Sequence, residues 1–334
     1  MQLTDKIKKY HKIIGITILF LLVIGIVVTG GNELNITLAS EIDASYPYDV
    51  VVAGNYAYYG DRDHIVVSDI SDVTNPQEIG RLDLSSRSND IAISGDYAYV
   101  ANGGNGLVIL DITEPAAPEK VGSYVTDSAY ELDVVGNYAY LIDGETTGIV
   151  IIDVTNPKSP SLAKIYNLQR RPNDIAIVGN YAYVATGSVG LIILDITEPT
   201  APMNVGIYRE GYEFVAKGVA VKDNYAYVAT GSDGLKIIDI TNPKSPSLIG
   251  NPEVGFITNC FSVSNNYLYV EQYSEFDIMS GFHSKKLVIL DITDPTIPRI
   301  VGKYKIEQVL SCTIKDNYVF VATGNDGVKI LSTN

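Results

Sequence analysis

The stretch YAYVATGSVGLIILDITEPTAP, from Tyr181 to Pro202, is one copy of a pattern that returns along most of the chain. A closely similar stretch begins at Tyr138, and another begins at Tyr225. Seven copies exist, and most of them start 41 to 44 residues after the previous one; their first aromatic residues are Tyr56, Tyr97, Tyr138, Tyr181, Tyr225, Tyr267 and Tyr318. Such a period is typical of architectures that repeat one supersecondary unit.

Each copy predicts four short β-strands. In the second copy the segments 89–95, 96–102, 106–112 and 119–125 are strand-length, rich in β-branched residues and bounded by turn residues. Gly-Asn or Gly-Asp precedes the tyrosine in the first four copies and is typical of a tight hairpin. Asp-Asn or Asn-Asn replaces it later, and these residues also tolerate positive φ. The copy is therefore predicted to be a four-stranded antiparallel blade.

The two ends of the chain predict that the blades close into a ring. The last copy stops at 327–334, directly after its third strand, whereas the segment 34–40 resembles a fourth strand that has no blade of its own. If 34–40 completes the last blade, no sheet edge is left exposed, unlike in an open solenoid. We therefore predict an all-β, seven-bladed β-propeller over residues 32–334, whose ring is closed by an N-terminal strand.

The N-terminus differs in kind from the repeats. Residues 1–12 carry four lysines, and residues 13–31 are uncharged and apolar, which is long enough for one transmembrane helix. The positive-inside rule places the basic flank in the cytoplasm and the propeller outside. A signal peptide cleaved near Gly30 and Gly31 is the alternative, and it predicts a secreted protein.

Several segments resemble the LVIVD repeat family: GLVILDITEPAAP, GIVIIDVTNPKSP, GLIILDITEPTAP, GLKIIDITNPKSP and KLVILDITDPTIP. The upstream GNYAYVA element matches as well, and the resemblance covers nearly everything after residue 45. It implies a propeller of the kind found in envelope and secreted proteins of bacteria and archaea. It implies no catalytic residues.

The composition and motifs argue against several functions. The net charge of −15 disfavours nucleic acid as a partner. The sequence contains no HExxH, no zinc-type cysteine spacing and no nucleophile elbow, so we expect no enzyme. The tyrosines repeat in every copy, which indicates packing between blades rather than a ligand site.

Four carboxylates are candidates for chemistry at the channel mouth. Asp49, Asp90, Glu131 and Asp174 each lie seven residues before an anchor tyrosine, near the start of the innermost strand. Together they would offer oxygen ligands to Ca²⁺, the one possible cofactor. The alternative interpretation is that each caps nearby backbone N–H groups.

Two further candidates concern covalent modification. Cys260 and Cys312 fall on the innermost strands of blades six and seven, and in an oxidising compartment they are predicted to form a disulfide or to remain buried thiols. Asn35 begins an Asn-Ile-Thr sequon in the closing strand and is a glycosylation candidate.

The long loop 271–286 of blade six and the segment 167–174 map to one face, which we predict to be the binding face. Its candidate residues are Tyr273, Phe276, Phe282, His283, Arg170 and Arg171. The predicted function is a membrane-anchored binding module at the cell surface, with an envelope protein or polysaccharide as partner. A cation-dependent lyase or hydrolase that uses the channel carboxylates is the alternative.

Overall fold

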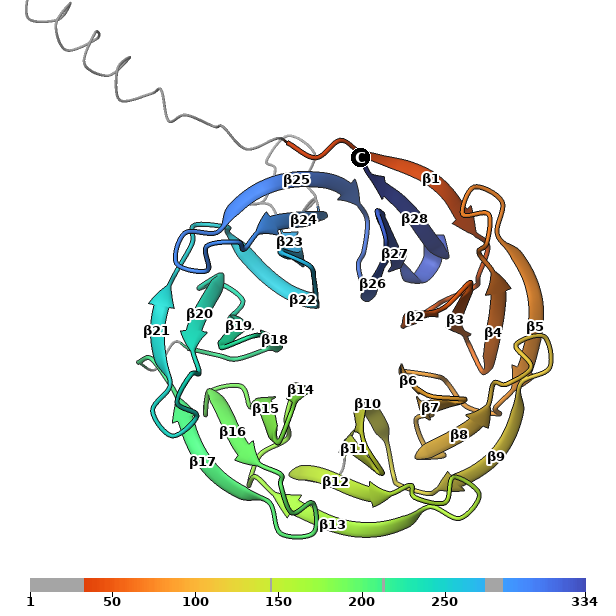
Figure 1. Cartoon of the computed structure of the whole chain (residues 1–334), viewed down its shortest axis with the longest axis horizontal. Helices are drawn as coiled ribbons and strands as arrows, with labels where there is room; N and C mark the ends of the chain where they lie inside the picture. The colour runs from red at the N-terminus through yellow and green to blue at the C-terminus, as the bar shows by residue number, and fades with distance from the viewer. Residues whose placement is uncertain (1–32, 145, 212–213, 274–284) are drawn as a thin grey trace, which may run out of the picture. The chain divides into compact units, whose positions relative to one another are not determined.

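In the computed structural model of the chain, seven four-stranded antiparallel sheets form a closed ring over residues 34–334 (Figure 1). The structure describes residues 33–144, 146–211, 214–273 and 285–334; within these, the side chains of 256 and 258–261 are not described. The prediction of a seven-bladed propeller is confirmed.

The strands of each blade follow one another in sequence from the centre of the ring to its perimeter. Blade one contains β2 (Val50–Ala53), β3 (Tyr56–Asp61), β4 (His64–Asp69) and β5 (Gln77–Asp83). Blade two contains β6 (Asp90–Ser94), β7 (Tyr97–Ala101), β8 (Leu107–Asp111) and β9 (Glu119–Tyr124). Blade three contains β10 (Ala129–Val135), β11 (Tyr138–Asp143), β12 (Gly148–Asp153) and β13 (Ser161–Asn167). Blade four contains β14 (Asp174–Val178), β15 (Tyr181–Ala185), β16 (Leu191–Asp195) and β17 (Met203–Tyr208).

The remaining blades follow the same order until the ring closes. Blade five contains β18 (Gly218–Lys222), β19 (Tyr225–Ala229), β20 (Leu235–Asp239) and β21 (Ser247–Gly250). Blade six contains β22 (Phe256–Ser264), β23 (Tyr267–Tyr273), β24 (Lys285–Asp291) and β25 (Arg299–Ile306). Blade seven contains β26 (Ser311–Lys315), β27 (Tyr318–Ala322), β28 (Val328–Thr333) and, from the other end of the chain, β1 (Ile36–Ile42). A 3-10 helix, η1 (Gly324–Asp326), precedes β28.

The pairing of β1 with β28 closes the ring. Ile36 lies opposite Thr333, and Ile42 lies opposite Val328, in antiparallel register. The predicted closing strand is thus correct, although it extends over 36–42 rather than 34–40. Because β1 covers the last strand, blade seven is complete and presents no unpaired third strand.

The hairpin turns confirm the prediction from the Gly-Asn and Asn-Asn pairs. A two-residue turn joins the first and second strands of each blade. The first of these two residues has positive φ in all seven blades, as at Gly54 (φ 56°) and at Asn265 (φ 52°). In the last three blades this residue is Asp223, Asn265 or Asp316. Asparagine and aspartate adopt this region at lower cost than other non-glycine residues, which is why they replace glycine there.

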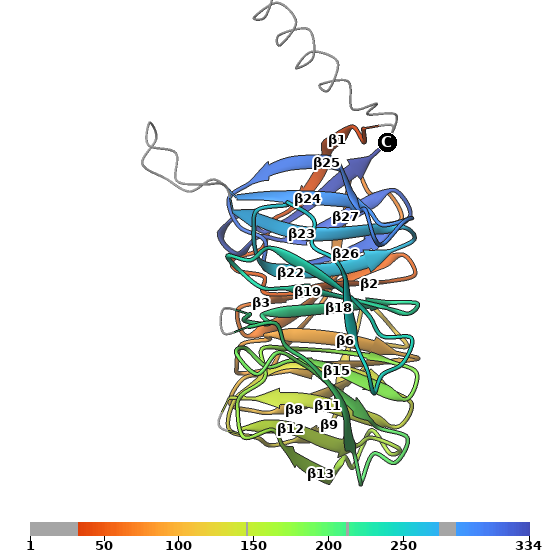
Figure 2. The same ribbon diagram turned by 90° about the vertical axis from the view of Figure 1, so that its left-hand side faces the viewer.

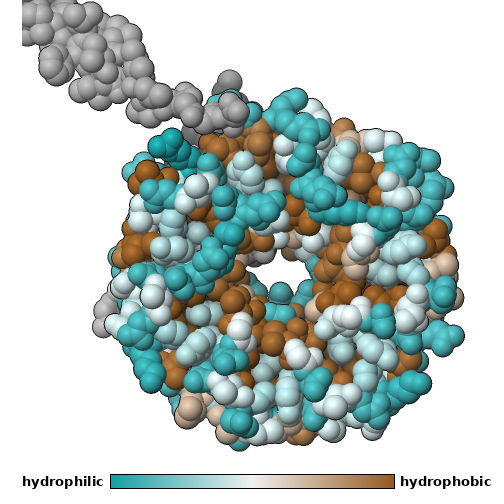
Figure 3. All heavy atoms as spheres, viewed as in Figure 1, coloured by the Kyte–Doolittle hydropathy of each residue, from teal (hydrophilic) through white to brown (hydrophobic). Residues whose placement is uncertain are grey.

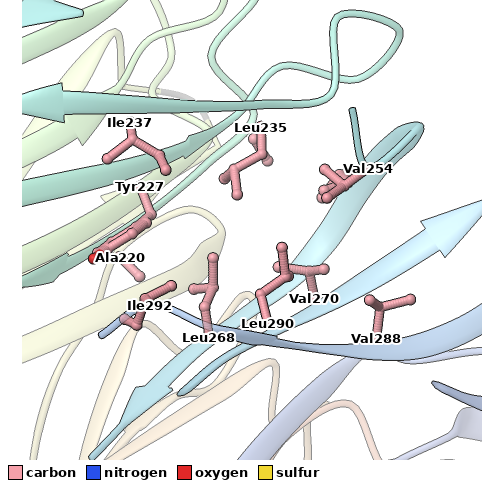
Figure 4. Packing of buried hydrophobic residues seen from close by; sticks show 12 residues of the cluster. Ala220, Tyr227, Leu235, Ile237, Val254, Leu268, Val270, Val288, Leu290 and Ile292 are labelled. Carbon is pink, nitrogen blue, oxygen red and sulfur yellow. The ribbon is translucent and has the colours of Figure 1, made fainter. Parts of the chain in front are cut away.

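The hydrophobic core consists of seven clusters, and each one fills the space between two neighbouring blades. Figure 4 shows the cluster between blades five and six, where Leu235 and Ile237 of β20 face Leu268 of β23 and Leu290 of β24. The second and third strands of each blade are buried on both faces because another blade lies on each side, so their sequences are continuously apolar rather than alternating. Tyr58 and Tyr140 are buried in such clusters, as expected for packing between blades.

A glycine in the fourth strand permits neighbouring blades to approach at the perimeter. A Cβ atom added at Gly122 of β9 would overlap the carbonyl oxygen of Pro157, in the turn of the next blade, and one at Gly80 would lie 2.6 Å from the carbonyl oxygen of Pro115. In blade three, Lys164 stands at the equivalent position, opposite Ile151.

Within the described residues no helix is long and apolar enough to cross a membrane. The predicted anchor over 13–31 and its basic flank over 1–12 lie outside the described residues.

Candidate functional site

The innermost strands of the blades surround a central channel, seen as an opening through the molecule in Figure 3. A cavity of about 480 Å³ occupies it. Its charged lining residues are Asp49, Asp90, Glu131, Asp133, Asp174 and Lys217. Most of them stand where the innermost strands begin, and we call this end of the ring the mouth face. Figure 2 shows the ring from the side, with the strands running between the two faces.

Three of the four predicted channel carboxylates accept a hydrogen bond from the backbone of the next blade. The bonds run from Ile91 N to Asp49 Oδ2 at 2.9 Å, from Leu132 N to Asp90 Oδ2 at 2.7 Å, and from Val219 N to Asp174 Oδ2 at 2.7 Å. These side chains therefore cap backbone N–H groups of the next blade, and Asp90 and Asp174 each also cap an N–H group of their own blade. Each bond satisfies a backbone donor that the sheet of that blade leaves free.

Blade three uses a different residue for this bond. Asp133 Oδ2 accepts the Ile177 N–H of blade four at 2.9 Å, two residues beyond the position that the sequence pattern indicated. Glu131 instead projects into the cavity among the other carboxyl groups. Glu131 is therefore the member of the predicted set that does not link two blades.

Asp49 and Asp90 both line the channel, and the Ser311 hydroxyl of blade seven donates a hydrogen bond to Asp49. Burial, followed by the charge of Asp49, raises the pKa of Asp90 well above its usual value. Burial also raises the pKa of Asp49, although the Ser311 hydrogen bond opposes this.

The two remaining predicted carboxyl groups also hold protons more tightly than usual. Burial and then the charges of Asp90 and Asp174 raise the pKa of Glu131 well above its usual value. Burial raises the pKa of Asp174 to about 7, even though its two backbone hydrogen bonds favour the ionised form. The channel thus contains carboxyl groups whose pKa values lie above their usual range.

The channel carboxylates already have hydrogen-bond partners in the protein. Asp90 and Asp174 use both carboxylate oxygens to accept backbone N–H groups, and Asp49 accepts one backbone N–H and the Ser311 hydroxyl. Ca²⁺ takes six to eight oxygen ligands, waters among them, and its binding in the channel stays a prediction. Within the described residues, no group of three or more His, Cys, Asp or Glu side chains is placed to hold a metal ion.

The mouth face carries two arginines that stack on tyrosines. The Arg87 guanidinium carbon lies 4.3 Å from the centre of the Tyr48 ring, and its Nη1 donates to Tyr48 Oη at 2.7 Å. The Arg171 guanidinium carbon lies 4.1 Å from the centre of the Tyr130 ring. A hydrogen bond with Ser128 lowers the pKa of the Tyr130 phenol, and the neighbouring Arg171 lowers it further. Both arginines are exposed, so their guanidinium groups remain accessible to a ligand.

An open hollow of about 330 Å³ lies beside the first of these pairs. It is lined by Tyr46, Tyr48, Arg62, Asp63 and Arg87. The rings of Tyr46 and Tyr48 lie 4.9 Å apart at 48°, and Asp63 is engaged with His64 Nδ1 at 2.9 Å. The hollow therefore combines aromatic surface with positive charge.

The predicted binding-face residues fall into two groups. Arg170 and Arg171 are exposed between β13 and β14, on the mouth face. Tyr273 ends β23 on the same face, with Lys285 Nζ 4.6 Å from the centre of its ring. Phe276, Phe282 and His283 lie outside the described residues.

Sequence reasoning missed Tyr46, Tyr48, Arg87 and Tyr130. They come from three different segments but share two repeat positions: Tyr46 and Arg87 lie ten residues before their anchor tyrosines, and Tyr48 and Tyr130 lie eight residues before theirs. The departures from the repeat, SYPYD at 45–49 and SSRSN at 85–89, were the available hint.

The two modification candidates have different outcomes. Cys312 is disulfide-bonded and is not a free thiol. The side chain of Cys260, the other cysteine of the chain, lies outside the described residues, so the Cys260–Cys312 pairing stays a prediction. The Asn35 side chain is exposed next to β1, and its glycosylation also stays a prediction.

A family model, the LVIVD repeat, matches residues 46–83, 86–126, 128–168, 169–210, 215–253 and 281–306. The chain belongs to the LVIVD repeat family. The six matches fall on blades one to six, and the structure adds a seventh blade that combines both ends of the repeat region. No curated protein matches the chain.

Solved structures share the fold at low sequence identity. The β-propeller domain of Cps50 (Swd1) from Myceliophteria thermophila is 13% identical, with a TM-score of 0.69 over 88% of this chain and 99% of that one. The WD40 propeller domain of Doa1 is 10% identical, with a TM-score of 0.69 over 90% and 98%. At such identities the likeness concerns the fold alone.

Proposed function

We propose that this LVIVD-repeat propeller is an extracytoplasmic interaction module, tethered to the membrane by residues 13–31, that binds a partner of the cell envelope through its mouth face. The observation that carries the proposal is the pair of exposed arginines, Arg87 and Arg171, stacked on tyrosines at the rim of the channel. Within the described residues, neither arginine forms an ion pair with a carboxylate. Tyrosine and arginine are the residue types that most often dominate binding energy at interfaces.

The rest of the molecule supports such a role as a rigid scaffold. The channel residues Asp49, Asp90, Asp133 and Asp174 link neighbouring blades. Glu271 of blade six is fully buried and accepts the N–H of Val309, in the connection to blade seven, at 3.1 Å. Loops fixed at both ends by a closed ring present side chains in a constant arrangement, which lowers the entropy cost of binding.

Binding to isolated cell envelopes tests the proposal. Residues 34–334, which contain every strand of the ring, are compared with their Arg87→Ala/Arg171→Ala variant. We expect the double substitution to weaken binding by at least tenfold, because two charge-assisted contacts are lost. Arg299→Ala is the matched control, since Arg299 is also exposed but begins β25 at the opposite end of the ring. Equal binding by the double variant and by the control would refute the mouth face as the site.

The tether is tested separately. Recovery of the intact chain from washed membranes supports an anchor, whereas a soluble product that begins after residue 31 indicates a cleaved signal peptide.

A second candidate function is acid–base chemistry by the channel carboxyl groups, as in a lyase or hydrolase. The raised pKa values of Glu131 and Asp174 within a cavity favour it, since perturbed groups in a cavity are typical of active sites. Glu131→Gln tests it, because this side chain holds no blade-to-blade bond. An activity on an envelope substrate that survives this substitution would count against the candidate.

A further inference from the structure

We propose that the partner at the mouth face is an acidic polysaccharide, a polymer of uronate-type sugars, bound along an arc of alternating tyrosine and arginine side chains. This inference rests on the proposed function and names the chemistry of its ligand. The arc comprises Tyr46, Tyr48, Arg87, Tyr130 and Arg171.

The arc is continuous from blade one to the start of blade four. Tyr46 and Tyr48 precede β2, Arg87 lies between β5 and β6, Tyr130 belongs to β10, and Arg171 precedes β14. Arg87 contacts Tyr48, and its Nε donates to Asn89 Oδ1 at 2.9 Å. The Asn89 amide in turn donates to the carbonyl of Ala129 at 2.6 Å, next to Tyr130, on whose ring Arg171 stacks. Aromatic and cationic groups therefore follow one another around the channel mouth.

The charge of the arc selects an anionic ligand. The chain has a net charge of −15, so most of its surface repels anions. The guanidinium groups of Arg87 and Arg171 are exposed and, among the described residues, have no carboxylate partner. Arginine offers a planar fork of donors that binds a carboxylate through two parallel hydrogen bonds.

The aromatic members of the arc favour sugar rings over an acidic peptide. Tyr46 and Tyr48 line a hollow of about 330 Å³ that offers apolar ring surface next to the Arg87 guanidinium. A uronate presents an apolar C–H face and a carboxylate on the same ring, and its polymer repeats both, as the arc does. The carboxylates of an acidic peptide would satisfy the arginines but would leave the aromatic hollow unfilled.

The experiment measures binding of the full chain, in detergent micelles, to three probes: oligogalacturonate, a neutral malto-oligosaccharide of equal length, and polyglutamate. We expect oligogalacturonate to bind and the neutral oligosaccharide not to bind. Arg87→Ala and Arg171→Ala should each weaken binding about tenfold, and Tyr46→Ala should weaken it severalfold. Arg299→Ala, at the far end of the ring, should leave it unchanged.

Several results would overturn the proposal. Tighter binding of polyglutamate than of oligogalacturonate would indicate a protein partner. Equal binding of the neutral oligosaccharide would remove the role of the arginines. If no probe binds but Arg87→Ala/Arg171→Ala still abolishes envelope binding, the polysaccharide is wrong and the interaction site stands. If envelope binding also survives that substitution, the site itself is wrong.

Discussion

Replacement of Asp174 by asparagine should remove one pH-dependent contribution to the free energy of unfolding. Asp174 lines the channel, and its pKa rises from 3.8 to about 7 on folding. The folded state therefore binds this proton more tightly than the unfolded state. The stabilisation is complete below about pH 4 and is lost as the pH rises through about 7. A difference of about 3 pH units corresponds to about 4 kcal/mol in the free energy of unfolding.

Asparagine cannot titrate, but it keeps one acceptor oxygen where the aspartate uses two, one for Ile175 N–H and one for Val219 N–H. The lost hydrogen bond costs about 1 kcal/mol at any pH. From pH 4 to pH 8, the free energy of unfolding of Asp174→Asn should thus rise by about 4 kcal/mol relative to that of the unchanged protein. At pH 8 the variant should be the more stable of the two.

Urea unfolding of residues 34–334 at pH 4, 6 and 8 measures this difference. Tyrosine fluorescence is a suitable probe because the chain has 24 tyrosines and no tryptophan. Asp195→Asn is the control of opposite sign: hydrogen bonds from Thr197 lower the pKa of Asp195, so its contribution is present at neutral pH and is lost as the pH falls. The reasoning is refuted if the difference in the free energy of unfolding between Asp174→Asn and the unchanged protein stays constant with pH, or if the variant becomes relatively less stable as the pH rises. Either result would show that the backbone donors keep Asp174 ionised.

The remaining predictions concern packing and closure. Gly122→Ala should lower the free energy of unfolding by about 1–3 kcal/mol in urea titrations, because the new methyl group overlaps the Pro157 carbonyl. Lys164→Ala, at the equivalent position in blade three, should change the free energy of unfolding by less than about 0.5 kcal/mol. Equal effects of the two substitutions would disprove the steric argument. Removal of residues 1–42 should expose β28 as an edge strand and produce oligomers in size-exclusion chromatography, whereas a monomer with an unchanged unfolding midpoint would contradict the role of β1 in closure.

Much of the fold was predictable because the repeat specifies each blade locally. Strand lengths, the hairpin turns before Tyr97 and Tyr138, and the apolar runs of the third strands are all set by near neighbours in the chain. Closure was predictable as well, since a missing strand at one end matched a surplus strand at the other. The sequence did not explain why glycine recurs in the fourth strand, because Gly122 contacts the Pro157 carbonyl only when two blades pack together.

The candidate site was predictable only in part. The sequence pattern placed Asp49, Asp90 and Asp174 at the channel, yet it could not tell that their oxygens bond to the next blade. It identified Arg171 from a local pair of arginines but missed its stacking partner, Tyr130, which lies 41 residues earlier in the chain.

By itself, the sequence determined the number of blades, their strand order and the way the ring closes, because a hydrophobic period and turn residues act over a few residues. Only the tertiary structure decided which side chains meet around the channel, because those contacts depend on how each blade is placed against the next. Three of the four carboxylates that suggested a metal site, Asp49, Asp90 and Asp174, link neighbouring blades, and tyrosines and arginines from separate segments form one surface at the mouth.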